Sequence, residues 1–130
     1  MSRLVPITIP LPAASKAALE HHSRASRPAE AVAAVFRDDR GHHHARRLAN
    51  RHPDPKTGFH VDPIEFAHVE AEERRAGHEL CAWFHSHPFG RAMPSAADIA
   101  RAWAGVETWI GGFTDDDAFE LVRFAHAGRP

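Results

Sequence analysis

The residues of this chain that could carry chemistry gather around one short motif, in which a single serine separates two histidines. His85 and His87 end an apolar run that predicts a strand, and side chains two positions apart in a strand share one face. Asp98 falls in the first turn of the next predicted helix, where its carboxylate can point back towards the strand end. Two imidazoles and one carboxylate, with a fourth position left for water, are the ligand set of a catalytic zinc ion (Zn2+).

Simpler explanations exist for each part of this pattern. Ser95-x-x-Asp98 is also a capping box, which needs no metal, and a lone His-x-His pair is often incidental. A closed structural zinc site is not favoured, because such sites use four ligands, often cysteines, and Cys81 is the only cysteine. Cys81 also lacks an obvious partner histidine, which argues against a cysteine protease.

The spacing of the whole segment resembles the signature of the JAMM (MPN-plus) zinc metalloproteases, the family of the JAB and MPN domains. His85-Ser86-His87-Pro88 is followed, after a spacer that ends at Pro94, by Ser95-x-x-Asp98. The run Arg27-Pro28-Ala29-Glu30-Ala31 resembles the segment that supplies the family's catalytic glutamate. Family members often continue with Cys-Gly-Leu, whereas this chain continues with Ala31-Val32-Ala33. The resemblance covers most of the chain, which is similar to the short bacterial members of the family.

This resemblance implies a zinc-dependent peptidase or isopeptidase. Zinc would be held by His85, His87 and Asp98, and a zinc-bound water would attack the carbonyl of an amide bond. Glu30 would act as general base and then as acid, and Ser95 would donate a hydrogen bond to the oxyanion. The implied substrate is the C-terminal tail of a ubiquitin-like or sulfur-carrier β-grasp protein, cut after a terminal glycine pair.

Other functions stay open at this point. The chain could be a non-catalytic MPN scaffold that serves as a binding module, or a relative that cleaves peptidoglycan peptides. A zinc deaminase is a third alternative, since the family's fold is similar to that of cytidine deaminases. Deaminases of that kind use a cysteine pair, so the single Cys81 disfavours this reading.

The order of the predicted elements indicates an α/β fold of the α+β type, and we expect one JAB/MPN domain over residues 1–130. A mixed, mostly antiparallel β-sheet should be flanked by helices, and the family resemblance adds a cytidine-deaminase-like arrangement. Alternation and short apolar runs predict strands at 4–9, 29–37, 46–51, 59–61, 79–87, 108–113 and 119–124. Caps and periodicity predict helices from Ser15 to about 28, from Asp62 to Gly77 and from Ser95 to Gly105.

The composition of the chain limits the kinds of partner and the compartment that we expect. A net charge of -1 at pH 7 excludes strong electrostatic attraction to nucleic acid or to an anionic membrane, and the oligomeric state stays open. The single cysteine suits a reducing compartment, and neither a signal peptide nor a membrane span is expected, so we predict a cytoplasmic location. Histidine is frequent, and the runs His21-His22 and His42-His43-His44 are predicted to be solvated surface rather than metal-binding tracts.

Overall fold

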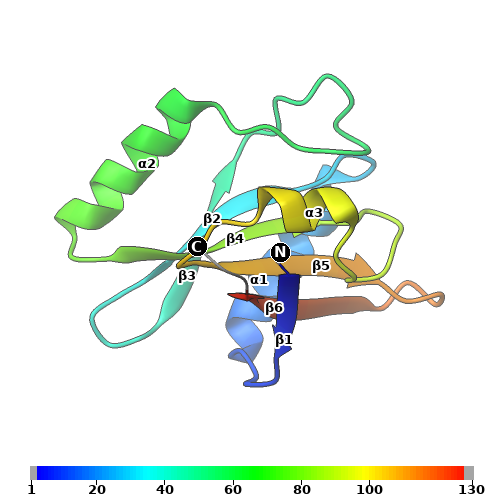
Figure 1. Ribbon diagram of the computed structural model, residues 1–130, viewed down its shortest axis with the longest axis horizontal. Helices are drawn as coiled ribbons and strands as arrows, with labels where there is room; N and C mark the ends of the chain where they lie inside the picture. The colour runs from blue at the N-terminus through cyan, green and yellow to red at the C-terminus, as the bar shows by residue number, and fades with distance from the viewer. Residues whose placement is uncertain (1–2, 128–130) are drawn as a thin grey trace.

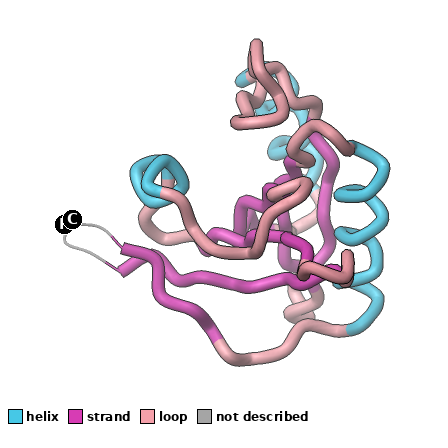
Figure 2. The backbone as a smooth tube through the Cα atoms, turned by 90° about the vertical axis from the view of Figure 1, so that its right-hand side faces the viewer, coloured by secondary structure: helices cyan, strands magenta, loops and turns pink. Residues whose placement is uncertain are grey.

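A computed structural model describes residues 3–127 and contains one mixed sheet with a helix on one face and two on the other. The strand order is β1-β6-β5-β4-β2-β3, and only the β4–β5 pair is parallel. Figure 1 shows α2 and α3 in front of the sheet and α1 behind it, and Figure 2 separates α1 from α3 in side view. The elements are β1 (Arg3–Ile7), α1 (Ala13–Ser26), β2 (Val32–Arg37), β3 (His43–Leu48), α2 (Pro63–Arg75), β4 (Glu79–Ser86), α3 (Ala96–Arg101), β5 (Glu107–Phe113) and β6 (Phe119–Ala127).

The predicted mostly antiparallel sheet with flanking helices is confirmed, and its two faces account for the apolar runs in the sequence. On one face, Ala33 and Val35 of β2 and Phe84 of β4 pack with Leu19 of α1. On the other face, Val32 and Phe36 pack with Val69 of α2. The central strands are buried on both sides, which is why they read as continuous apolar runs rather than as alternating ones.

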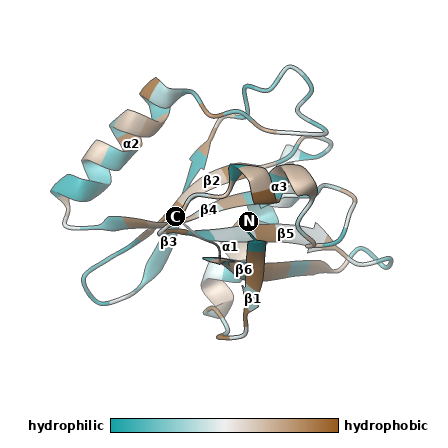
Figure 3. Cartoon of the chain, viewed as in Figure 1, coloured by the Kyte–Doolittle hydropathy of each residue, from teal (hydrophilic) through white to brown (hydrophobic). Residues whose placement is uncertain are grey.

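Helix α2 is the most weakly buried of the longer elements. Only Val69 and Glu73 of this helix are buried, and Ile64 at its first turn is exposed. Figure 3 shows α2 as a mixture of hydrophilic and apolar segments. Within residues 3–127, no helix has the length and apolar character needed to cross a membrane.

Several predicted boundaries are wrong. Residues 59–61 form no strand, because the segment runs as a loop across the end of β2 and β4. Helix α3 ends at Arg101 rather than at Gly105, since Ala102 adopts an extended backbone with ψ 137°. The first helix begins at Ala13 after Pro12, not at Ser15.

The hairpin between β2 and β3 also differs from the prediction. Strand β3 begins at His43 instead of residue 46, so the turn lies at Asp38–His42. The Asp38 carboxylate accepts hydrogen bonds from the N–H groups of Arg40 and His42, and Gly41 has a φ of 83°. Because these hydrogen bonds pair the backbone N–H groups of the turn, the hairpin turn is shorter than the sequence predicted, and the strand begins within the histidine run.

The prediction of solvated surface histidines is wrong for His22, which is buried with its Nε2 3.0 Å from the carbonyl oxygen of Val32. It is also wrong in part for the second run. His43 packs edge-on against Trp109, and His44 stacks on Phe36 and meets Glu73. The prediction holds for His21, which is exposed, and for His42, whose side chain is 73% exposed.

Candidate metal centre and active site

The structure brings the three predicted metal-binding side chains together at the end of β4. His85 Nε2 lies 3.0 Å from Asp98 Oδ1, and His87 Nε2 lies 3.1 Å from Asp98 Oδ2. The three ligand atoms all lie within 4.8 Å of one another. The two histidines share a face because they are two positions apart in an extended strand, as the motif predicted.

Asp98 is placed by the first turn of α3. Ser95 Oγ accepts the N–H of Asp98 at 3.1 Å, and Asp98 Oδ2 accepts the N–H of Ser95 at 2.9 Å. The capping box is therefore present, and it coexists with the contacts to the histidines because the second oxygen, Oδ1, is left for His85. The cap fixes the carboxylate in the direction that the histidines require.

The polar atoms of this group fit a bound cation. His87 Nδ1 is 2.8 Å from the carbonyl oxygen of Arg91, and since a carbonyl can only accept, Nδ1 must carry the proton. A neutral His87 then directs the lone pair of Nε2 at a carboxylate oxygen. His85 Nε2 is buried without a hydrogen bond in spite of its closeness to Asp98. A divalent ion between these atoms would satisfy both nitrogens and the carboxylate together.

The electrostatics of the three side chains differ. Burial lowers the pKa of His85, which keeps its imidazole neutral. Burial alone would lower the pKa of His87, but its contacts with Asp98 and the Arg91 carbonyl oxygen raise it, so a metal would bind His87 by displacing a proton from Nε2. Burial alone would raise the pKa of the Asp98 carboxyl, but the imidazoles of His85 and His87 hold that pKa well below its ordinary range. A neutral imidazole and an ionised carboxylate are the forms that bind a metal.

Glu30 lies at the edge of this group, just before β2. In the β2–β4 pair, Val32 lies opposite His85, and the Ser86 N–H donates a hydrogen bond to the Ala31 carbonyl oxygen. The same register places Glu30 opposite His87, on the same face of the sheet. The backbone of Glu30 is held by Pro55 and Asn50 of the long loop, at 2.7 and 3.0 Å. Its side chain is buried, and this burial raises the pKa of Glu30 to about 7.

Ser86 points to the opposite face, as its position between the two histidines predicts. Its hydroxyl accepts the N–H of Ala31 at 2.8 Å in the interior. This bond ties the end of β4 to the start of β2, so Ser86 positions the histidines and Glu30 relative to each other.

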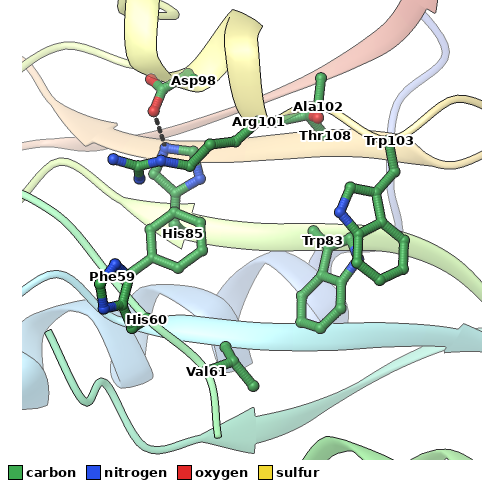
Figure 4. Close-up of a pocket in the computed structure, with 10 residues that line it drawn as sticks. All are labelled: Phe59, His60, Val61, Trp83, His85, Asp98, Arg101, Ala102, Trp103 and Thr108. Carbon is green, nitrogen blue, oxygen red and sulfur yellow. Dashed lines mark ion pairs between the residues drawn. The ribbon is translucent and has the colours of Figure 1, made fainter. Parts of the chain in front are cut away.

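A cavity of about 440 Å³ opens beside His85 and Asp98 (Figure 4). Phe59 stacks on His85 with ring centroids 4.9 Å apart, and Arg101 lies over the Phe59 ring. At the other end Trp83 and Trp103 meet edge to face at 5.3 Å. These walls were missed from the sequence, where residues 59–61 were predicted to form a strand.

A second cavity, of about 350 Å³, lies on the other side of His87. Glu30 and Lys56 line it together with Pro88 and Phe89, and Phe89 is among the most exposed apolar residues. The candidate metal group and Glu30 thus border two cavities, with His85 and Asp98 on one and His87 and Glu30 on the other.

Comparison with known proteins decides the family. The sequence model described as prokaryotic homologs of the JAB domain matches residues 12–125. The chain belongs to this JAB family. The match spans every element from α1 to most of β6, and so includes all five residues singled out from the sequence.

Two curated relatives of the JAB chain are named as a conjugate-cleaving protease and a desampylase. It is 42% identical over 74 residues to a probable TtuB-protein conjugate cleaving protease of Thermus thermophilus, covering 57% of this chain and 50% of the relative. It is 32% identical over 68 residues to a desampylase of Haloferax volcanii, covering 47% of this chain and 49% of the relative. The chain spans about half the length of these relatives.

Solved structures resemble the JAB chain in fold. A solution structure from Desulfitobacterium hafniense superposes with a TM-score of 0.72 at 22% identity, covering 90% of this chain and 88% of that one. A solution structure from Salinibacter ruber gives a TM-score of 0.61 at 18% identity, covering 94% and 89%. At these identities the likeness extends to the fold alone.

Proposed function

We propose that this chain is a zinc metallopeptidase that hydrolyses the amide bond after the C-terminal Gly-Gly of a ubiquitin-like or sulfur-carrier β-grasp protein. The observation that carries the proposal is the convergence of His85, His87 and Asp98 beside a buried Glu30. The names of the two curated relatives, which describe cleavage of protein conjugates and desampylation, favour this substrate class.

His85, His87 and Asp98 would hold the zinc ion. Zinc bound there would supply Lewis acidity, lowering the pKa of a water molecule and polarising the scissile carbonyl. The chain contributes the rigidity of the site, since β4, the capping box of α3 and the His87–Arg91 contact fix each ligand before the ion arrives.

Glu30 would move the proton. Its carboxylate accepts a proton from the attacking water and then delivers it to the leaving amine, and a pKa of about 7 suits both steps near neutral pH. The burial that raises this pKa also keeps bulk water away from the carboxylate.

Ser95 would stabilise the oxyanion. A hydroxyl can accept one hydrogen bond and donate another, so the N-cap bond from the Asp98 N–H leaves the Ser95 proton free for the substrate. Its capping and catalytic roles are compatible without any reorientation.

The two cavities beside the site would receive the two sides of the scissile bond. A glycine pair suits cleavage at this group, because it brings backbone close to the metal group without side chains. We propose that the aromatic cavity lined by Phe59, Trp83 and Trp103 takes an apolar segment of the substrate.

The test is cleavage of a panel of C-terminally extended and conjugated β-grasp proteins by zinc-loaded protein. We expect cleavage after the glycine pair, loss of about 10²-fold or more in rate for Glu30→Gln with zinc retained, and loss of both zinc and activity for His85→Ala. Glu65→Gln, at a partly exposed acid of α2, is the matched control and should stay active.

Two results would contradict the proposal. Full activity in Glu30→Gln would remove the assigned base. Zinc bound through His85 without turnover of any panel member would instead support a non-catalytic binding module.

A further inference from the structure

A second group of metal-binding side chains lies far from the catalytic group, where the end of α2 meets the edge of the sheet. His44 of β3, Glu73 of α2 and His78 just after the helix converge there, with their ligand atoms within 4.8 Å of one another. His44 Nε2 and His78 Nδ1 lie 2.5 and 2.9 Å from the same oxygen, Glu73 Oε1.

This group resembles the candidate catalytic group in composition and ring spacing, although both of its imidazoles contact one carboxylate oxygen instead of one each. The rings of His44 and His78 have centroids 5.1 Å apart, against 5.2 Å for His85 and His87. Both groups consist of two imidazoles and one buried carboxylate. The group of His44, Glu73 and His78 is the more accessible of the two, since the side chains of His44 and His78 are 39% and 27% exposed.

The neighbouring cation does not occupy the same position. Arg46 Nη1 binds the other carboxylate oxygen of Glu73, Oε2, at 2.8 Å, and its Nη2 binds Glu72. Arg46 therefore holds the Glu73 carboxylate through Oε2 and leaves Oε1 to the two imidazoles. Arg46 and the two imidazoles thus contact different oxygens of one carboxylate, and the arginine contact leaves the imidazole side open to a cation.

We propose that His44, Glu73 and His78 form a second metal site, which binds zinc or another divalent transition-metal ion. Imidazole nitrogens with one carboxylate oxygen suit such ions better than calcium or magnesium, which prefer oxygen ligands. Three protein ligands on a partly exposed surface leave the remaining coordination to water. This site is independent of the proposed peptidase function.

The site has a structural role that follows from its three elements. Helix α2 buries little apolar surface, and its C-terminal turn is held to β3 mainly by the contacts of Glu73. An ion bound there fastens the helix to the hairpin edge. The ring of Phe66, in the same helix, packs against Trp83 and Trp103 with centroid distances of 4.8 and 6.3 Å. An ion at this site would therefore also stabilise one wall of the large cavity.

The experiment is a zinc titration of the full chain against a chromophoric chelator, with ion content checked by elemental analysis. We expect two tightly bound ions in the unmodified protein and one in each of His85→Ala, His44→Ala and His78→Ala. His42→Ala removes an exposed histidine of the same hairpin and should leave both ions bound.

A thermal readout separates the second site from the first. In a His85→Ala background, saturating zinc should raise Tm by about 5 °C or more, and adding His78→Ala should abolish that shift. A single ion in the unmodified protein that His85→Ala removes and His44→Ala retains overturns the proposal. So does a second ion that is retained in both His44→Ala and His78→Ala, and so does a thermal shift that His78→Ala leaves unchanged.

Discussion

At the scale of single residues, the proposed role of Glu30 as a base would place two opposing demands on its carboxyl group. A base must be ionised to accept a proton, yet the burial that shields Glu30 disfavours its ionised form and raises its pKa to about 7. In the metal-free protein the folded state therefore binds a proton more tightly than the unfolded chain between about pH 4.5 and pH 7. Stability from this group is lost as the pH rises through that window.

We expect Glu30→Gln to stabilise the metal-free protein in a pH-dependent way. The variant should match the unmodified protein near pH 4.5 and exceed it by on the order of 1–3 kcal/mol at pH 8, where an ionised buried carboxylate has been removed. Urea unfolding in the presence of a chelator measures this difference.

Two controls sharpen the Glu30 experiment. Glu65→Gln should show no such pH-dependent gain, since Glu65 is partly exposed and a glutamine there can still accept the Ala49 N–H. Saturating zinc should shrink the gain, because a cation beside Glu30 favours its ionised form. A gain of the same size at pH 4.5 and pH 8 would show that burial of the charge is not its cause.

The individual residues of the site differed in how far the sequence could predict them. His85, His87 and Asp98 were placed correctly in space because strand period and a helix cap are local rules. Glu30 was found through family resemblance, since nothing local marks a buried glutamate. Phe59 and Trp103 were missed because their contacts join segments that only the folded chain brings together.

At the scale of elements, Gly112 of β5 controls the loop that carries the partner of His87. A Cβ at Gly112 would lie 2.3 Å from the N of Ala92 and 2.5 Å from the carbonyl carbon of Arg91, both backbone atoms that cannot rotate away. The Arg91 carbonyl fixes the proton on His87, so a shift of this loop reaches the candidate metal centre.

We expect Gly112→Ala to cost about 1–3 kcal/mol in stability and to weaken zinc binding at the His85 site by about 10- to 100-fold. Unfolding curves and a zinc titration measure the two effects. Gly90→Ala is the matched control in the same loop, because its Cβ would make only an ordinary 3.6 Å contact with His87. Equal effects of the two substitutions would argue against the steric explanation.

Element types were more predictable than element ends. The buried strands and capped helices follow from apolar runs, Asp62 and Ser95, and both caps are observed. The predicted strand at 59–61 failed because Phe59 packs on His85 as part of a loop instead of pairing with a neighbouring strand. The end of α3 at Arg101 was missed because residues 102–105 carry no strong stop signal before Gly105.

At the scale of the whole molecule, the large cavity is assembled from a loop, two strands and the end of α3. Trp103 is half exposed at its rim, which is a costly place for an indole unless a partner covers it. We expect Trp103→Ala to raise KM for a cleaved β-grasp substrate by about 10-fold with little change in kcat, since the lost contact is made equally in ground and transition states.

Steady-state kinetics on the preferred panel substrate measure the Trp103 effect. Ile64→Ala removes another exposed apolar side chain that lies outside the cavity lining, and it should leave both constants unchanged. A fall in kcat without a rise in KM would mean that Trp103 acts on the metal centre instead of on substrate binding.

The strand order has a final consequence for association between copies of the chain. Among residues 3–127, strands β3 and β1 end the sheet, so each presents a backbone edge that another strand could extend. Strand β3 carries His43, His44, Arg46 and Arg47, and β1 contains Pro6, which has no N–H to offer. Charge repulsion between copies opposes pairing at the β3 edge, and the missing N–H of Pro6 opposes pairing at the β1 edge. Edge-to-edge aggregation is therefore disfavoured although the buried strands are strongly apolar.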